Sequence, residues 1–251
     1  MTREEMMCVA AARALPDRAC VFVGIGLPST AANLARRLHA PDIVLFYESG
    51  TIGAKPDVLP VSIGDAELAE TADSVVSVPE IFAYWLQAGR IDIGFLGAAQ
   101  IDRFANINTT VIGDYDRPDV RLPGAGGAPE IAAHAGEVFV VVRHSPRTLV
   151  ERVDFITTAG FLDGGDARER AGFRGRGPTR VITDLGMLEP DPVSRELILT
   201  AIHPGIDVSD VQRATGWPLQ VNAALHTTPE VTTEELEVLR ALRRRTGERA
   251  G

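Results

Sequence analysis

The sequence contains few residues of the kinds that bind metals or form disulfides. Its 251 residues include only two cysteines, Cys8 and Cys20, and five histidines scattered along the chain. The cysteines do not form a CxxC motif, and no histidine pair has metal-ligand spacing on one helix face. No serine occurs in a Gly-x-Ser-x-Gly elbow. We therefore expect reduced thiols, histidines satisfied at the surface or in the core, no metal site and no serine-hydrolase triad.

Long apolar runs and an excess of basic charge are also missing. No run approaches the roughly 20 apolar residues that span a bilayer, and the N-terminus, with Glu4 and Glu5, does not resemble a secretory signal. The formal net charge is -9, which offers no counter-charge to a nucleic acid or an anionic membrane. We expect a cytoplasmic metabolic protein without either partner. Its length and 45% hydrophobic content suit one α/β domain over residues 1–251.

An acidic residue follows a predicted buried strand. Residues 43–47 form a short continuous apolar run, and Glu48 comes directly after it, before Ser49 and Gly50. In open α/β sheets, ligands bind outside the carboxyl ends of the strands. Two interpretations stay open on this pattern alone. Glu48 is a catalytic nucleophile, or it is a solvated loop glutamate, which is the commoner case.

A glycine turn lies at the same predicted sheet edge. Residues 20–23 predict a buried strand, residues 24–28 a turn containing Gly24 and Gly26, and the following residues a helix that Ser29 or Thr30 caps. A right-handed βαβ unit brings this turn and Glu48 to one edge. The glycines suggest a cradle for an anion or a phosphate. A dinucleotide site is disfavoured, because Ser29 replaces the third glycine of its fingerprint.

Further along the chain, amide side chains and a glycine cluster are candidates for binding. Gln100 and Asn106 follow another predicted strand and can bind a carboxylate or a carbonyl, although local turn bonding explains such amides equally well. Residues 124–127 read Gly-Ala-Gly-Gly, which is either a simple turn or a set of exposed N–H groups that stabilises an oxyanion. The alternation of strands and helices predicts an α/β fold with a mostly parallel sheet. Residues 180–183 and 196–202 predict a strand pair at an antiparallel edge.

Several of these motifs together resemble a known family. They are GIGLP (24–28), ESG (48–50), GAAQID (97–102), NINTTVIGDY (106–115), GAGGA (124–128) and VITDLGML (181–188). Each motif alone is weak, but their order and spacing are specific and cover nearly the whole chain. The chain resembles the β subunit of the family I CoA-transferases, in particular the glutaconate type.

The resemblance implies a three-layer αβα fold with a mostly parallel, Rossmann-like open sheet, as in ribose-phosphate isomerase-like proteins. It also implies a homologous α subunit, an active site at the junction of the two subunits, and a hetero-oligomer of two α and two β subunits or more. On the matching positions, Glu48 corresponds to the nucleophile, and Gly126 and Gly127 to the oxyanion-binding turn. The positions implied to bind the substrate or coenzyme A are Gly24, Gly26, Gln100, Asn106 and Gly124.

The resemblance further implies that coenzyme A is a substrate and is carried as a glutamyl-CoA thioester on Glu48, without a metal or redox cofactor. The expected acid is a dicarboxylate or a 3-oxoacid. Lys55 is the only cation close after the ESG motif, so the α subunit is expected to recognise the substrate's charge. Two alternatives remain: a hydrolase of CoA-linked rings with Glu48 as base, and a catalytically silent module that binds CoA esters or sugar phosphates. The retained glutamate favours transfer.

Overall fold

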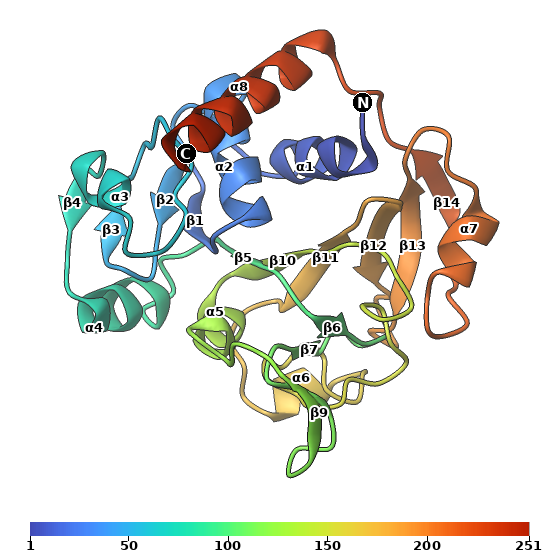
Figure 1. Ribbon diagram of the computed structural model, residues 1–251. Coiled ribbons are helices and arrows are strands. Elements are labelled where there is room, and N and C mark those ends of the chain that lie inside the picture. Colours follow the sequence, from blue (N-terminus) through green and yellow to red (C-terminus); the bar gives the residue numbers. More distant parts are fainter. Residues whose placement is uncertain (251) are drawn as a thin grey trace.

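A ten-stranded sheet runs through the molecule and carries helices on both faces (Figure 1). The computed structural model describes residues 1–250, with side chains described for residues 1–247. The strand order is β14-β13-β12-β11-β10-β5-β1-β2-β3-β4. These strands are β1 (Cys20–Val23), β2 (Val44–Phe46), β3 (Thr51–Ile52), β4 (Ser74–Val75), β5 (Ile93–Leu96), β10 (Glu137–Val141), β11 (Pro178–Ile182), β12 (Gly186–Pro190), β13 (Leu197–Ile202) and β14 (Val221–Thr227).

The centre of the sheet is parallel, as the alternation of strands and helices predicts. Strands β2, β1, β5, β10 and β11 pair in parallel, whereas β3, β4 and β12 run antiparallel to their neighbours. The predicted α/β fold class is confirmed. Because parallel strands share one direction, the carboxyl ends of β1, β2, β5, β10 and β11 lie at one edge of the sheet, where α/β proteins bind ligands.

Alternating side chains divide the core into two layers. Val21 and Leu45 of the central strands face one apolar cluster, and Phe22 and Phe46 face the other. The first layer is covered by α1 (Arg3–Arg13), α2 (Leu27–Leu38) and α8 (Thr233–Ala250), above the sheet in Figure 1. Burial on both faces explains why the strands read as continuous apolar runs in the sequence.

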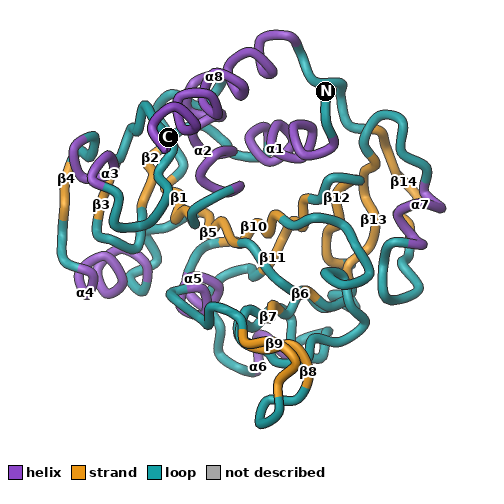
Figure 2. Tube along the Cα trace, in the orientation of Figure 1, coloured by secondary structure: helices purple, strands orange, loops and turns teal. Residues whose placement is uncertain are grey.

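The second face is less regular. It carries α4 (Val78–Glu80), the π-helix η1 (Ile81–Leu86), α5 (Ala128–His134), α6 (Ala167–Arg170) and two small hairpins, β6 (Gln100–Ile101) with β7 (Ile107–Asn108) and β8 (Val111–Gly113) with β9 (Pro118–Arg121). Figure 2 shows that loops connect most of these elements. The remaining helices, α3 (Ala66–Glu70) and α7 (Val208–Arg213), lie toward the two ends of the sheet (Figure 1).

One predicted strand pairing is wrong. Both predicted strands exist as β11 and β13, but β12 lies between them and pairs antiparallel with each. The chain reverses tightly after β11, where Thr183 N–H donates to Gly186 O at 2.9 Å. A Cβ at Gly186 would lie 2.2 Å from Ala201 O, so a glycine is needed for β12 to approach β13. The single domain over residues 1–251 stays a prediction, and residue 251 lies outside the described part of the chain.

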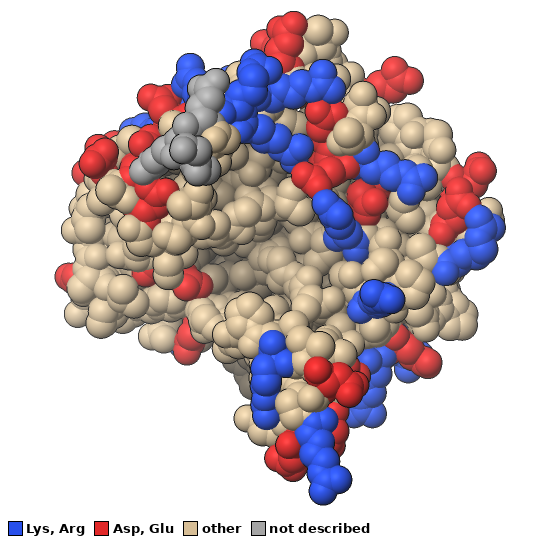
Figure 3. Space-filling view, viewed as in Figure 1, with Lys and Arg blue, Asp and Glu red and all other residues tan. Residues whose placement is uncertain are grey.

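The front of the molecule is hollowed. In Figure 3 the hollow lies between the layer of α1, α2 and α8 and the segments below the sheet. Its floor consists mainly of residues other than Lys, Arg, Asp and Glu, whereas charged side chains gather around it. The hollow therefore presents a concave surface of low charge.

Candidate active site

The candidate nucleophile lies in a tight turn at the carboxyl end of β2. Tyr47 N–H donates to Thr51 O at 3.1 Å, and Gly50 N–H donates to Tyr47 O at 3.0 Å, which closes the turn around Glu48. Gly50 has a φ of 96°, and a Cβ there would lie 2.0 Å from Val76 O. Only glycine satisfies both conditions without strain. The motif ESG is thus explained by the turn that presents Glu48.

Tyr47 anchors this turn to α2. Its hydroxyl lies 3.1 Å from Ser29 Oγ and 3.4 Å from Asn33 Nδ2, and burial raises the pKa of the Tyr47 phenol. Tyr47 is thus held in the layer of α2, whereas the half-buried Glu48 side chain contacts Gly127, which directly precedes α5 on the other face of the sheet.

The glycine cluster meets Glu48 there, 79 residues further along the chain. Gly127 N–H donates to Glu48 Oε1 at 3.1 Å. A Cβ at Gly127 would lie 2.7 Å from Glu48 Oε1 and 2.6 Å from Phe82 Cζ. Gly126 has a φ of 50° and stands directly beside the same carboxylate, with 3.9 Å between the position of a Cβ and either oxygen. The structure therefore brings together Glu48, Gly126 and Gly127.

The first glycine turn lies at the same edge. Strand register places Phe22 beside Phe46 and Val23 beside Phe95, so Gly24 follows β1 next to the carboxyl ends of β2 and β5. Gly24 N–H donates to Phe95 O at 3.2 Å. The turn is close-packed here, since a Cβ at Gly24 would lie 3.3 Å from the same oxygen.

Gly26 is the N-cap of α2, so the prediction of a cap at Ser29 or Thr30 is wrong. Gly26 has a φ of 88°, and Pro28 occupies the first turn of the helix. Gly26 O accepts both the N–H and the Oγ1–H of Thr30. Ser29 turns inward to Tyr47 instead. The helix begins earlier because glycine adopts the backbone conformation that turns the chain from β1 into α2.

Gln100 and Asn106 lie in the small hairpin of β6 and β7, with their amides engaged inside the chain. Gln100 Nε2 donates to Asp154 Oδ2 at 2.9 Å, and its Oε1 accepts Asn108 Nδ2 at 2.7 Å. Asn106 Nδ2 donates to Asp102 Oδ2 at 3.0 Å, and its Oδ1 accepts two backbone N–H groups. Both side chains are buried. Their geometry is that of structural amides, and a role in substrate binding stays a prediction.

Gly124 begins the segment that carries Gly126 and Gly127. It has a φ of 103°, and its N–H donates to Thr109 O at 2.8 Å. This bond ties the segment that follows β9 to the one between β7 and β8. Gly124 therefore helps to position Gly126 and Gly127, and direct binding of substrate by it stays a prediction.

Two buried histidines lie in a polar cluster after the carboxyl ends of β10, β11 and β13. His144 Nδ1 lies 3.0 Å from Thr183 Oγ1, and His144 Nε2 lies 2.8 Å from Thr215 Oγ1. His203 Nε2 lies 2.8 Å from Thr183 O. Burial lowers the pKa of His144 to about 4, against a smaller opposite effect of Asp184. Both are satisfied core histidines, as expected, but their proximity was not predictable from their spacing.

Acid is expected to destabilise the fold through His144. The unfolded chain binds a proton below the ordinary pKa of 6.5, whereas the folded chain resists protonation until about pH 4. The stabilising contribution is complete above pH 6.5 and is lost as the pH falls toward 4. When the pH falls from 7 to 5, the free energy of unfolding of the wild type should decrease by about 2 kcal/mol because of His144. This part of the decrease should be absent in His144→Gln.

Urea denaturation of the wild type and the variant at both pH values measures this difference. His226 is exposed, so His226→Gln is the matched control and should keep the wild-type pH dependence. If the free energy of unfolding decreases equally in the wild type and in His144→Gln between pH 7 and pH 5, His144 is not the group responsible.

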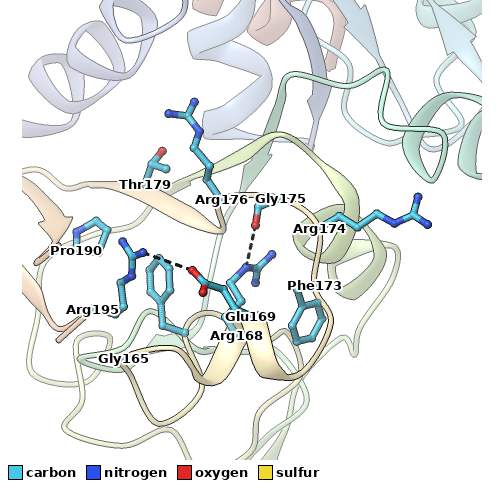
Figure 4. Close-up of a pocket in the computed structure, with 11 residues that line it drawn as sticks. Gly165, Arg168, Glu169, Phe173, Arg174, Gly175, Arg176, Thr179, Pro190 and Arg195 are labelled. Atoms are coloured by element: carbon cyan, nitrogen blue, oxygen red, sulfur yellow. Dashed lines mark hydrogen bonds and ion pairs between the residues drawn. The ribbon is translucent and has the colours of Figure 1, made fainter. Parts of the chain in front are cut away.

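A separate cavity of about 440 Å³ is lined by several arginines (Figure 4). It lies beside the start of β11 and the end of the antiparallel β12. This edge of the sheet is opposite to the edge at which Glu48 lies. Arg168 donates to backbone carbonyls, including Gly175 O at 3.2 Å, and Arg195 lies 3.9 Å from Glu169. The side chains of Arg174 and Arg176 extend away from the cavity (Figure 4). Its charges are engaged by the chain itself, so the candidate site remains at Glu48.

Among the side chains that the structure describes, those of residues 1–247, no group of three or more from His, Cys, Asp or Glu is arranged to hold a metal ion. In the same part of the chain, none of the helices combines the length and apolar character needed to cross a membrane.

Comparison with known proteins identifies the family. A model of the family described as Coenzyme A transferase matches residues 4–214. The chain belongs to this family. The CoA-transferase chain is 60% identical over 242 residues to one subunit of the 3-oxoadipate CoA-transferase of Pseudomonas knackmussii, covering 96% of this chain and 93% of that protein. It is 36% identical over 230 residues to one subunit of the glutaconate CoA-transferase of Acidaminococcus fermentans, with 89% and 86% covered.

The fold agrees with a solved member of the family. The crystal structure of glutaconate coenzyme A-transferase from Acidaminococcus fermentans matches the CoA-transferase chain with a TM-score of 0.90 and 32% identity, covering 96% of this chain and 94% of that one. The resemblance drawn from the motifs is confirmed. Identity is higher with the 3-oxoadipate relative than with the glutaconate relative. Both relatives are named as one subunit of their enzyme, which implies a second kind of subunit.

Phe82 is the site residue that the sequence did not reveal. It lies on η1, and its ring reaches the Gly127 turn beside Glu48. In the sequence it is one of several apolar residues with helical spacing, which ordinarily indicates a core position. Only the proximity of η1 to the two turns distinguishes it.

Proposed function

We propose that this β subunit transfers coenzyme A between an acyl-CoA and a carboxylic acid through a glutamyl-CoA thioester on Glu48. The observation that supports this most directly is the hydrogen bond from Gly127 N–H to Glu48 Oε1. It joins a carboxylate at a strand end to a backbone donor in a glycine turn, which are the two parts that acyl transfer needs.

The reaction proceeds by two exchanges. A Glu48 oxygen attacks the thioester carbonyl of the donor, expelling the CoA thiolate and leaving an acyl-glutamyl anhydride. The thiolate then attacks the glutamyl carbonyl, the donor acid leaves as a carboxylate, and glutamyl-CoA remains. The acceptor carboxylate attacks this thioester, and the same steps in reverse produce the new acyl-CoA and restore Glu48.

Gly127 has a defined role in these steps. Its N–H already points at Glu48 Oε1, which becomes the glutamyl carbonyl oxygen when the other oxygen forms the anhydride. Negative charge develops on this atom each time the thiolate or the acceptor attacks the glutamyl carbonyl. A donor held in place before the reaction stabilises that charge without reorganisation. Gly126 leaves room for the attacking group to approach the glutamyl carbonyl, because it places no side chain beside the carboxylate.

The proposed substrates are 3-oxoadipate and its CoA ester, because the relative with 60% identity is named for 3-oxoadipate. This acid is both a dicarboxylate and a 3-oxoacid. Lys55 Nζ is paired with Asp73 at 2.7 Å and does not offer a free charge. We therefore assign recognition of the remote carboxylate to a homologous α subunit, in an assembly of two α and two β subunits or more.

The proposed chemistry uses coenzyme A as substrate and covalent intermediate and requires neither a metal nor a redox cofactor. Gly24 and Gly26 lie at the same sheet edge as Glu48 and form a backbone turn suited to the CoA ester. A cytoplasmic location follows from the composition and stays a prediction.

The thioester itself tests the proposal. The complex of this chain with its α subunit is incubated with 3-oxoadipyl-CoA without acceptor, treated with borohydride and digested. Reduction of a thioester on Glu48 to an alcohol is expected to lower the mass of the peptide that contains it. Glu48→Gln is the control and should give an unmodified peptide.

Adding the acceptor acid then separates transfer from hydrolysis. Transfer is expected to consume the thioester and yield a new acyl-CoA, whereas a hydrolase releases free CoA at the same rate with or without acceptor. An unmodified wild-type peptide, together with full activity in Glu48→Gln, would refute the assignment of Glu48.

A further inference from the structure

The helix beside Glu48 has an unusual geometry. In η1, Gln87 N–H donates to Phe82 O at 2.8 Å, which spans five residues instead of four. The next such bond runs from Arg90 N–H to Trp85 O at 2.9 Å. π-Helical segments are rare and occur frequently at functional sites. The contacts that the η1 side chains make therefore indicate what the wider helical turn is for.

Aromatic contacts hold η1 against the carboxyl ends of the two strands that lead into the site. The Phe82 ring lies 5.6 Å from the Phe22 ring of β1, and the Trp85 ring lies 5.0 Å from the Phe46 ring of β2, centroid to centroid. The segment before α4 is also bonded to the catalytic turn, where Val76 N–H donates to Gly50 O at 2.9 Å. These contacts position η1 relative to both strands and to the Glu48 turn.

The edge of the Phe82 ring and the Glu48 carboxylate both meet Gly127. The position of a Cβ on Gly127 lies 2.6 Å from Phe82 Cζ and 2.7 Å from Glu48 Oε1. The ring edge and the carboxylate oxygen therefore both border the space that glycine leaves open. An aromatic edge carries partial positive charge and is compatible with an anion, while the ring displaces water.

We propose that Phe82 is a specificity-determining residue that protects the glutamyl-CoA thioester from water. This inference rests on the proposed thioester on Glu48. Two reactions compete for that thioester. Attack by the acceptor carboxylate leads to transfer, and attack by water on the glutamyl carbonyl breaks the C–S bond, restores the Glu48 carboxylate and releases CoA thiol and a proton.

Apolar contact beside the carbonyl lowers the access of water, whereas the acceptor acid is delivered by its own binding contacts. Phe82 therefore lowers the rate of hydrolysis relative to the rate of transfer. Removing its ring opens a space large enough for water next to the reacting carbon.

The ratio of hydrolysis to transfer tests this role. The complex with the α subunit is loaded with 3-oxoadipyl-CoA, and the rates of free CoA release and of new acyl-CoA formation are measured together. Phe82→Ala is expected to raise the hydrolysis-to-transfer ratio by about tenfold or more. Phe82→Leu keeps most of the apolar volume and should stay near the wild type, with Phe82→Val between them. Because it is a ratio, partial loss of folded protein does not change it.

Tyr84→Ala is the matched control, because Tyr84 is an exposed aromatic residue of the same helix. It should leave the ratio unchanged. If the borohydride experiment shows the thioester but Phe82→Ala and Phe82→Val keep the wild-type ratio, this inference is wrong and the proposed function stands. If the wild type forms no adduct on Glu48, both are wrong. If Phe82→Ala does not fold, the hydrolysis-to-transfer ratio of Phe82→Val serves as the test: an increase over the wild type supports the role of Phe82, and an unchanged ratio contradicts it.

Discussion

Replacement of Glu48 by glutamine is expected to lower kcat for CoA transfer by at least about 10⁴-fold. The amide has nearly the same shape, and its oxygen can still accept the Gly127 N–H that Glu48 Oε1 accepts at 3.1 Å. It lacks the anionic oxygen that attacks the donor thioester in the proposed mechanism, so that covalent route is closed. Steady-state kinetics of the complex with its α subunit measure the effect.

Glu48→Gln should fold normally, because Glu48 is half-buried and Tyr47 provides the anchor of the turn. Urea denaturation checks this point. Glu70, exposed at the end of α3, supplies the matched control, and Glu70→Gln should keep full activity. Retention of more than a few per cent of the wild-type kcat in folded Glu48→Gln would rule out a nucleophilic Glu48.

Substitution of Gly127 by alanine is expected to reduce kcat by about 10²–10³-fold, the usual cost of disabling one oxyanion donor. The added methyl group would lie 2.7 Å from Glu48 Oε1 and 2.6 Å from Phe82 Cζ. Both distances are shorter than a van der Waals contact, so the carboxylate, the ring or the turn must move. A shift of the carboxylate or of the turn lengthens the bond from Gly127 N–H to Glu48 Oε1.

The control is Gly64→Ala, because a Cβ there meets only Ser62 Oγ at 3.9 Å among the described residues. It should leave both kinetic parameters unchanged. For Gly127→Ala, kcat should fall far more than KM rises, since the donor acts on charge that develops during the reaction. A variant that instead loses only affinity would place Gly127 in substrate binding and contradict its role as oxyanion donor.

Local patterns predicted the strands that lead into the candidate site. Continuous apolar runs identified β1 and β2, because strands buried on both faces have no polar side. Predictions failed where glycine replaced side-chain signals. Gly26 begins α2 ahead of Ser29 and Thr30, and Gly186 allows β12 to insert between β11 and β13.

The amides Gln100 and Asn106 show a different limit. As polar residues after a strand they were candidates for binding, and so they remain, but their hydrogen bonds run to Asp154, Asn108 and Asp102 within the fold. A sequence motif identifies a residue as a candidate, but it does not distinguish a residue that binds a ligand from one that stabilises a loop. That distinction depends on partners that are distant in the sequence.

By itself the sequence determined the α/β class, the strand that presents Glu48, and the family. These follow from local composition and from the order of short motifs. Only the tertiary structure decided that Gly127 donates to Glu48 across 79 residues, that Tyr47 holds the turn from the opposite face, and that Phe82 borders the carboxylate. Such contacts arise from the packing of η1 and α5 on one face of the sheet and of α2 on the other, and long-range packing leaves no periodic signal in the residues that it brings together.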